Sequence, residues 1–373
     1  MALRFKGCES TLDKKTTIKD VAALCRVSIA TVSRVFSNSS SVDPAIAEKV
    51  KAAALQLNYR PNLAAQAMRR KSANQIAIVV PSLLNSYHAD IVAGAIAEAD
   101  QCDQNVIVKI SDFNPKTESE CFDSLTNAFI DGILFLPTSG HNPIARFPQF
   151  QTLPHVIIGR RNFDSHASHV CVDNIATGYI ATQYLLRLNR RRIALLINLP
   201  IEQLENKDSV EIFNLLNSKS HESFSIFDRF SGYQTALKEG GVNFDSQLLI
   251  PCGLSEDTLL FNIQRVLGQQ IEFDAILAPQ VNAAIQIIRF LSSQGIDIPR
   301  DVSIISFTGG PLANISKPSV TTISSDYYEL GRSAVHQLNS LIRNGAVSEI
   351  VYPVNLEIRQ STLKKIKANM EKD

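Results

Sequence analysis

From Gln75 onward, short β-branched apolar runs alternate with helix-like stretches, and this alternation constrains the fold more than any other feature of the chain. Strands that are apolar along their whole length and alternate with amphipathic helices are typical of parallel sheets covered on both faces. About 300 residues are many for one open sheet, so we predict two α/β lobes. The predicted strands are "QIAIVVP", "NVIVKIS", "DGILFLP", "PHVIIG", "RRIALLIN", "DAILAP" and "DVSIISF".

Three loop segments follow or overlap the ends of these predicted strands. Ligands of open parallel sheets bind at the carboxyl ends of the strands. This rule predicts that "PSLLNSYH", "GRRN" and "SFTGG" lie on the rim of a cleft.

Near the start of the chain, two helix-length apolar patterns stand close together in "TIKDVAALC" and "SIATVSRVF". Thr17 can cap the first helix and Ser28 the second, which leaves only "RV" for the turn. Asp43 followed by Pro44 predicts the start of a third helix. Two helices joined by so short a turn can share a core with a third helix only if the two cross each other at a steep angle. We therefore predict a helix-turn-helix. The alternative is a small helical subdomain packed on the rest. The apolar positions are Ile18, Val21, Ala22 and Cys25, then Ile29, Val32, Val35 and Phe36, then Ile46, Val50, Ala53 and Leu57.

Charge is distributed unevenly along the chain. The whole sequence carries a net charge of +1, yet residues 16–71 hold nine Lys or Arg against three acidic residues. A basic module attached to a mildly acidic body fits contact with a polyanion, and a solvated basic face is the alternative.

Several classes of protein fit the sequence poorly. The six cysteines form no CxxC pair, no apolar run reaches the roughly 18–20 residues that span a bilayer, and no export signal is visible. A P-loop, GxSxG, HExxH and GxGxxG are all missing, so we predict no enzyme, no cofactor and no metal site. His166 and His169 could ligate a metal, but a surface loop explains them better. We expect a cytoplasmic protein without membrane contact.

With these elements placed, the sequence resembles the LacI (lactose-repressor) family of bacterial transcription regulators from about Thr16 to Thr362. The motifs "TIKDVA", "VSIATVSRVF", "LNYRPNLAAQAM", "DGILFLP", "VDNIATG", "IPRDVSIISF" and "PSVTTI" stand in the family's order. The resemblance implies an allosteric regulator, which we predict to be a repressor, whose homodimer (or tetramer) binds palindromic double-stranded operator DNA. It also implies a core like that of periplasmic binding proteins. The expected domains are a tail (1–15), the DNA-binding head (16–60), a hinge helix or linker (61–73), the core (74–363) and a second tail (364–373).

By this resemblance, Ile29 and Ala30 lie where family members read bases. Both are apolar here and suit thymine methyl groups, so we expect Arg34 to supply a guanine contact. The family usually has Gly in the turn where this chain has Arg26, which we interpret as a variation that adds a phosphate contact. The predicted DNA-binding residues are Thr17, Ile18, Ser28, Ile29, Ala30, Thr31, Ser33, Arg34, Tyr59, Asn62 and Met68.

A hinge is expected where Pro61 and Asn62 begin a short helix that is too poor in apolar residues to be stable alone. The family's hinge helix orders on DNA and inserts an apolar wedge into the minor groove, a position that Met68 occupies here. A plain basic linker is the alternative.

The expected effector cleft departs from the family pattern. Arg229 matches the family arginine that grips effectors, but three carboxylates that ring the pocket in relatives are missing. We therefore favour an anionic effector, such as a sugar phosphate or a carboxylate, over a neutral sugar. The alternative is a regulator whose cleft takes no ligand, or which responds to a protein. The predicted effector-binding residues are Tyr87, His88, Arg160, Arg229, Gln280, Thr308 and Ser325.

Between Asn198 and Arg229 the chain is longer than the family pattern. Ile212, Leu215 and Leu216 give this insertion a helical rhythm. We interpret this insertion as a lid, as a surface that binds a partner, or as a solvent-exposed loop.

Overall fold

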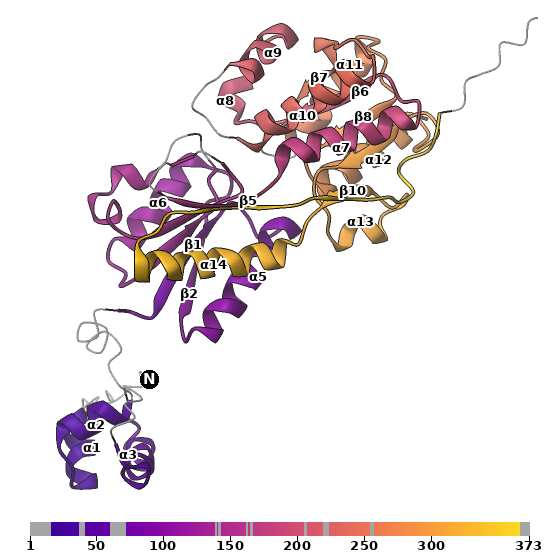
Figure 1. The fold of residues 1–373 in the computed structure, drawn as a ribbon. Coiled ribbons are helices and arrows are strands. Elements are labelled where there is room, and N and C mark those ends of the chain that lie inside the picture. The colour runs from indigo at the N-terminus through magenta and orange to yellow at the C-terminus, as the bar shows by residue number, and fades with distance from the viewer. Residues whose placement is uncertain are drawn as a thin grey trace, which may run out of the picture. The chain divides into compact units, whose positions relative to one another are not determined.

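The computed structural model divides the chain into two compact units, residues 1–73 and residues 74–373, which we call the head and the core (Figure 1). Residues 201–202 and 257–258 are described by their backbone only. The described residues are 16–36, 42–59, 72–138, 140, 143–161, 163–164, 167–204, 207–218, 224–253 and 257–365. The predicted tail at 1–15, most of the predicted hinge and residues 366–373 lie outside them.

The described residues of the head form three short helices around one small hydrophobic core. They are α1 (Ile18–Cys25), α2 (Ile29–Phe36) and α3 (Pro44–Gln56). The helix-turn-helix prediction is confirmed in its elements, and most of the predicted apolar positions are buried. Two positions were wrong as core residues, because Ile29 is 43% exposed and Ile46 38% exposed. The buried residues are Val21, Ala22, Cys25, Val32, Val35, Val50, Ala53 and Ala54.

Side chains cap the N-terminal ends of these helices, as the sequence predicts. The Thr17 amide and hydroxyl both donate to the Asp20 carboxylate, each at 2.7 Å. The Ser28 hydroxyl accepts from the Thr31 amide at 3.0 Å, so Ser28 caps the helix that carries the predicted DNA-reading side chains. The Asp43 carboxylate accepts from the first amides of α3. Each cap fixes the point at which its helix begins.

The turn between α1 and α2 holds Arg26 in the left-handed region, with φ 54° and ψ 45°. This conformation costs a residue with a Cβ about 1–2 kcal/mol. We expect Arg26→Gly to stabilise the head by about 1 kcal/mol relative to Arg26→Ala, since both variants lose the guanidinium and only Gly relieves the strain. Hydrogen exchange of the α1 and α2 amides in the full chain measures this difference. Equal protection in the two variants would contradict it.

The core contains two sheets, and the first belongs to what we call the N-lobe. Its order is β11-β5-β4-β3-β1-β2, and every pairing within it is parallel. Helices α5 and α14 lie side by side against this sheet (Figure 1). The strands are β1 (Gln75–Val80), β2 (Asn105–Ile110), β3 (Gly132–Phe135), β4 (His155–Ile158), β5 (Ser168–Val172) and β11 (Glu349–Tyr352). The helices are α5 (Ser86–Gln101), α6 (Pro115–Leu125), η1 (Pro143–Arg146), η2 (Pro148–Phe150) and α14 (Tyr327–Asn344).

The second sheet belongs to the C-lobe and has the order β12-β10-β9-β8-β6-β7. Its pairings are parallel except that β12 runs antiparallel to β10. The strands are β6 (Ile193–Ile197), β7 (Leu249–Pro251), β8 (Ala275–Ala278), β9 (Ser303–Ser306), β10 (Thr321–Ser324) and β12 (Asn355–Glu357). The helices are α7 (Asn174–Arg187), α8 (Ile201–Leu204), α9 (Ser209–Asn217), α10 (Ser225–Glu239), η3 (Ser246–Leu248), α11 (Asp257–Gly268), α12 (Val281–Ser293) and α13 (Pro311–Ile315).

The two-lobed α/β prediction is confirmed, and each of the seven predicted strands is a strand of one sheet or the other. The chain passes between the lobes after β5, after β10 and after β11, so neither lobe is continuous in sequence. This arrangement lets a ligand in the cleft contact both sheets.

Two pairs of helices cross so closely that a glycine stands at each point of contact. A Cβ on Gly178 of α7 would lie 1.9 Å from the Arg229 carbonyl oxygen of α10, and one on Gly232 of α10 would lie 2.0 Å from the Ile175 carbonyl oxygen of α7. Gly94 and Gly331 make the same reciprocal approach between α5 and α14. The close crossing of α7 and α10 therefore fixes the position of the backbone that carries Arg229.

The insertion after β6 contributes α8 and α9 to the C-lobe (Figure 1). Ile212 and Leu216 of α9 are buried in the C-lobe core, which confirms the helical rhythm of this segment. None of the helices in the described ranges is both long and apolar enough to span a membrane.

Candidate functional site

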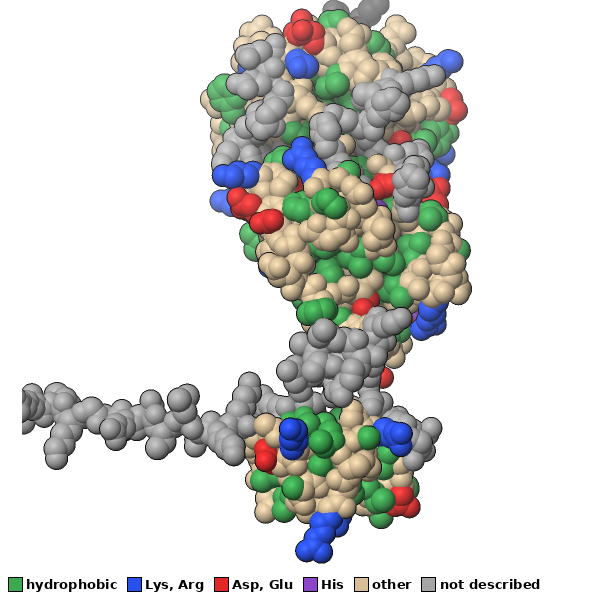
Figure 2. Space-filling model, turned by 90° about the vertical axis from the view of Figure 1, so that its left-hand side faces the viewer, with side chains coloured by type: hydrophobic (Ala, Val, Ile, Leu, Met, Phe, Trp, Pro, Cys, Tyr) green, Lys and Arg blue, Asp and Glu red, His purple; other side chains and the backbone are tan. Residues whose placement is uncertain are grey.

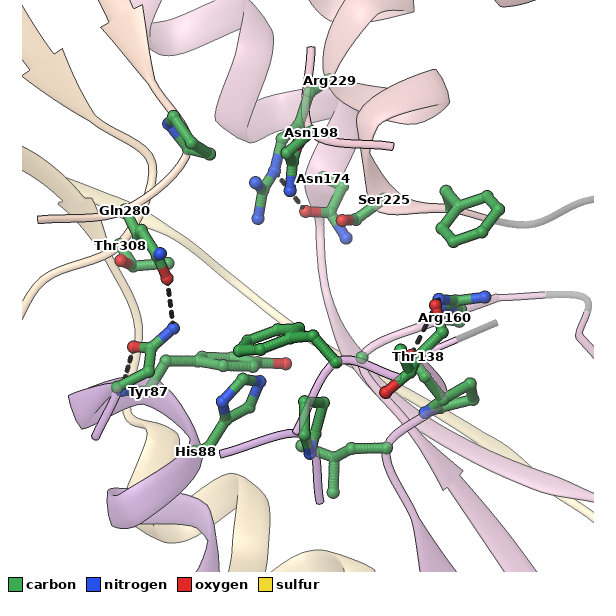
Figure 3. Close-up of a pocket in the computed structure, with 18 of the residues that line it drawn as sticks. Tyr87, His88, Thr138, Arg160, Asn174, Asn198, Ser225, Arg229, Gln280 and Thr308 are labelled. Carbon is green, nitrogen blue, oxygen red and sulfur yellow. Dashed lines mark hydrogen bonds between the residues drawn. The ribbon is translucent and has the colours of Figure 1, made fainter. Parts of the chain in front are cut away.

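A cavity of about 150 Å³ opens between the two lobes, at the carboxyl ends of strands from both sheets (Figure 3). The loops "PSLLNSYH", "GRRN" and "SFTGG" each contribute to its wall, as the strand-end rule predicts. Of the predicted effector-binding residues, the structure brings together Tyr87, His88, Arg160, Arg229, Gln280 and Thr308 around this cavity.

Ser325 is the predicted effector residue that the structure does not bring to the cavity. Its hydroxyl donates to the Pro353 carbonyl at 2.8 Å, where the chain passes between the lobes. It therefore lies on a connection between the lobes, apart from the cavity wall.

Arg229 of α10 is only 8% exposed, and it faces the cavity. Its Nε donates to the Asn174 side-chain oxygen at 2.9 Å, and its guanidinium carbon lies 5.0 Å from the centre of the Phe307 ring. Burial lowers the pKa of this guanidinium, although nearby tyrosines and Asp228 act in the opposite direction. Arginine nonetheless stays charged in proteins, so a buried cation here has a neutral amide as its hydrogen-bond partner.

Arg160 follows β4 and is also buried. Its Nη2 donates to the carbonyls of Pro137 at 2.8 Å and Thr138 at 3.2 Å. The guanidinium carbon lies 4.1 Å from the centre of the Phe224 ring and 5.3 Å from that of Phe163. Two aromatic rings and two carbonyls therefore hold this side chain in place.

The two arginines determine the charge of the cavity. Among its described lining residues there is no Asp or Glu, so the wall carries two buried positive charges without a carboxylate. An anionic ligand that enters the cavity would therefore meet two guanidinium groups and no carboxylate among the described lining residues, and it could accept charge-assisted hydrogen bonds from them.

Tyr87 and His88 come from the start of α5. The Tyr87 ring packs against Tyr327 at 4.8 Å and against His88 at 5.1 Å between ring centres, and burial raises the pKa of its hydroxyl. Burial lowers the pKa of His88 to about 4, although a hydrogen bond to the Ser82 backbone opposes this. His88 is therefore neutral at physiological pH and adds no third positive charge.

Three buried polar atoms of the cavity wall have no hydrogen-bond partner. They are His88 Nδ1, Asn198 Oδ1 and Thr308 Oγ1. Buried polar atoms are normally hydrogen-bonded, because leaving one unpaired costs about 1–3 kcal/mol. Their gathering at one cavity marks a site that a polar ligand would complete.

Some wall residues were missed by the sequence reasoning: Thr138, Asn174, Asn198 and Ser225 (Figure 3). Asn198 comes directly after β6 and Asn174 lies two residues after the end of β5, so the same strand-end rule could have identified both. Ser225 begins α10 after the insertion, and no strand end marked it.

The head presents α2 as its candidate DNA-binding helix. Ile29, Ala30 and Arg34 are exposed on it, while Thr31 and Ser33 are half-buried. On the face that Figure 2 shows, blue Lys and Arg side chains of the head stand among green hydrophobic ones. The exposed residues thus combine a cation with small and apolar groups.

The remaining predicted DNA-binding residues lie around α2. Thr17 and Ser28 are exposed and Ile18 is half-buried. Tyr59 packs on Phe36 with ring centres 5.8 Å apart, so its ring contributes to the head core. Asn62 and Met68 lie outside the described residues.

Comparison with known families matches both parts of the chain. Residues 17–62 match the model of bacterial regulatory proteins of the lacI family, and residues 182–362 match the periplasmic binding protein-like domain.

Curated relatives match along nearly the whole chain. The HTH-type transcriptional regulator RegA of Clostridium saccharobutylicum is 29% identical over 350 residues, which cover 93% of this chain and 99% of RegA. The HTH-type transcriptional regulator DegA of Bacillus subtilis is 28% identical over 359 residues, which cover 93% of this chain and 98% of DegA. Both relatives are transcription regulators.

Solved structures show the same fold. A lac repressor dimer bound to operator and the anti-inducer ONPF matches with a TM-score of 0.76 at 24% identity, covering 94% of this chain and 100% of that one. The transcriptional regulator CelR in complex with cellobiose matches with a TM-score of 0.65 at 24% identity, covering 93% and 99%.

Proposed function

Because this chain belongs to the LacI family of DNA-binding transcription regulators, we propose that it represses transcription as a homodimer on a palindromic operator and that a small anion in the core cleft controls it. The observation that carries the regulatory half of this proposal is the exposed α2 surface, capped by Ser28. The observation that carries the effector half is the cavity with two buried arginines and no carboxylate among its described lining residues.

The α2 surface supports a specific kind of base reading. Ile29 and Ala30 cannot make the bidentate hydrogen bonds that identify purines, but they can contact thymine methyl groups in the major groove. Arg34 is the exposed cation of this helix and is suited to a guanine. Thr17, Thr31 and Ser33 suit phosphates, which fix the register of the helix without reading sequence.

Arg34 gives the sharpest test of the DNA interface. Selection from a random pool of double-stranded oligonucleotides is expected to enrich a palindrome, and Arg34→Ala is expected to weaken binding to it by about 1–3 kcal/mol and to relax the preference at one position of each half-site. Lys51→Ala on α3 is the control, because Lys51 is exposed and already paired with Glu48 at 3.2 Å. Failure to enrich any site at moderate salt would refute the proposal, and so would equal effects of the two variants.

The effector class follows from the charges of the cavity. A phosphate or carboxylate can accept charge-assisted hydrogen bonds from a guanidinium, often in bidentate geometry. A neutral sugar offers hydroxyl donors, for which carboxylates would be the natural partners, and the described lining residues include none. The unpaired His88, Asn198 and Thr308 atoms would then bind the uncharged part of the ligand.

The operator complex itself can report the effector. Sugar phosphates and small carboxylates are expected to change the affinity of the full chain for its selected operator, and the matching neutral sugars are expected to leave it unchanged. A neutral sugar that changed the affinity at lower concentration than its phosphate would overturn the anion proposal. If no metabolite of either class had an effect, the head would act without a small-molecule signal.

The proposed assembly and domain division rest on further observations. The lac repressor structure cited above is a dimer on operator. The C-lobe exposes Phe261 and Ile315, and the N-lobe exposes Leu84, which are large apolar side chains suited to a subunit interface. We assign residues 16–60 to DNA binding, 61–73 to the hinge and 74–363 to effector binding and dimerisation. A regulator of this kind acts on the chromosome, so the proposal places it in the cytoplasm.

A further inference from the structure

One contact joins the two lobes across the cleft through an arginine and an aromatic ring. Arg160 belongs to the N-lobe, where it follows β4, and Phe224 belongs to the C-lobe core at the residue before α10. The Arg160 guanidinium carbon lies 4.1 Å from the centre of the Phe224 ring. A cation over an aromatic face at this distance attracts the ring, and more strongly in a site without water than at an exposed surface.

The N-lobe holds Arg160 in the position that this contact needs. Two carbonyls, those of Pro137 and Thr138, accept from its Nη2 at 2.8 Å and 3.2 Å. The Thr138 amide in turn donates to the carboxylate of Glu118, which is buried. The guanidinium is thus fixed to one lobe by its edge and offers a face to the ring of the other lobe.

Polar contacts join the lobes on the opposite side of the cavity. The Asn85 amide donates to the Gln280 side chain, and the Ser86 hydroxyl donates to the Gly309 carbonyl at 3.1 Å. Figure 3 shows Gln280 and Thr308 on one side of the cavity and Arg160 on the other. The lobes therefore cannot separate on the Arg160 side without breaking the contact with Phe224.

We propose that Arg160 and Phe224 form a latch that holds the cleft closed before any effector binds. Phe224 lies at the end of the insertion that follows β6, immediately before the helix that carries Arg229. The latch thus couples this insertion to the opening of the cavity. The proposed function is needed only for the consequence that the latch controls access of the effector.

A thiol in the cavity wall can report the opening of the cleft. Cys252 lines the cavity and is buried, and burial raises its pKa to about 12. The thiolate, and not the thiol, attacks an alkylating reagent and displaces its leaving group, so this residue should react only when the cleft opens. Cys171 lies buried in the N-lobe sheet, where burial, followed by the nearby Glu349, raises its pKa to about 12. It reacts only when that lobe unfolds and serves as an internal control.

The test measures the alkylation rates of both cysteines in the full chain by mass spectrometry of their peptides, without DNA or metabolite. Phe224→Leu removes the ring and keeps an apolar side chain, and it is expected to raise the rate at Cys252 roughly tenfold or more while the rate at Cys171 stays unchanged. Arg160→Met is expected to act similarly. The double variant should react no faster than the faster single variant, because each change breaks the same contact.

Phe213→Leu is the matched control, since Phe213 lies on α9 in the same lobe and packs on Phe244 with ring centres 4.8 Å apart. It should leave the Cys252 rate unchanged. The latch is refuted if neither Phe224→Leu nor Arg160→Met accelerates Cys252, if both accelerate Cys171 in parallel, or if their effects are additive. Because no effector is used, such a failure would leave the anion proposal standing, and an effector screen without hits would leave the latch standing.

Discussion

Gly178→Ala is expected to lower the stability of the core by about 3 kcal/mol or more. The new Cβ would lie 1.9 Å from the Arg229 carbonyl oxygen, a distance that forces the α7 and α10 backbones apart. Overpacking of a rigid contact typically costs about 1–3 kcal/mol, and backbone atoms yield less easily than side chains. For a core of this size the expected fall in Tm is roughly 5–10 °C, measured by circular dichroism on heating.

Gly268→Ala is the matched control for this substitution. Gly268 ends α11, and a Cβ there would meet no atom within 4 Å. The same change should therefore be neutral or stabilising by less than about 1 kcal/mol, since Ala favours helix more than Gly does. If both variants melted within about 2 °C of the unchanged chain, the close approach of α7 and α10 would be wrong.

Arg229→Met is expected to weaken binding of the anionic effector by about 2–5 kcal/mol, which is at least a 30-fold loss of affinity. Methionine fills much of the same volume without the charge, so an anion would enter the cavity with one cation fewer to neutralise it. Stability without ligand should change little, because the desolvation cost of the buried guanidinium disappears while Asn174 loses its partner. Thermal-shift titration with the anions that act on the operator complex measures both quantities.

Arg229→Lys separates charge from geometry in this experiment. Lysine keeps the positive charge but not the planar pair of donors, so an intermediate loss is expected. If the unchanged protein, Arg229→Met and Arg229→Lys all bound a neutral sugar equally well, the role of Arg229 in binding an anion would have no support. A large fall in the Tm of the methionine variant without ligand would show instead that Arg229 serves mainly to hold the fold.

The strands that the sequence identified are rich in β-branched and apolar residues, although β2 also contains Asn105 and Lys109 and is only partly buried. β1 and β6 are fully buried or nearly so, and such runs have no other stable position in a soluble protein. Strands β10 (TTIS) and β11 (EIVY) escaped notice because their apolar pattern is short or interrupted by polar residues. These segments are strands because neighbouring strands of the sheet pair with them, and their composition alone does not indicate a strand.

In the candidate site, too, the sequence identified some residues and could not identify the position of others. His88 was found because the strand-end rule and the family resemblance both mark its segment, whereas Arg229, which lies on α10, was found from the family resemblance alone. That Ser325 bonds to Pro353, away from the cavity, could not be read from its motif, since a serine on a loop has no preferred direction. The exposure of Ile29 likewise depends on how α2 crosses its neighbours, because its apolar character fits either a core or a groove-reading surface.

The sequence by itself determined the kinds of element and their order: a basic three-helix head, then strands and helices in alternation, with polar loops at the strand ends. Periodicity, capping residues and charge act over a few neighbours, and a sequence displays such local patterns directly. Only the tertiary structure decided which distant residues meet, including the contact of Arg160 with Phe224 across the cleft and the three unpaired polar atoms at one cavity. These depend on the packing of segments far apart in the chain, where small shifts in helix crossing determine whether a side chain is buried, bonded or left facing a ligand.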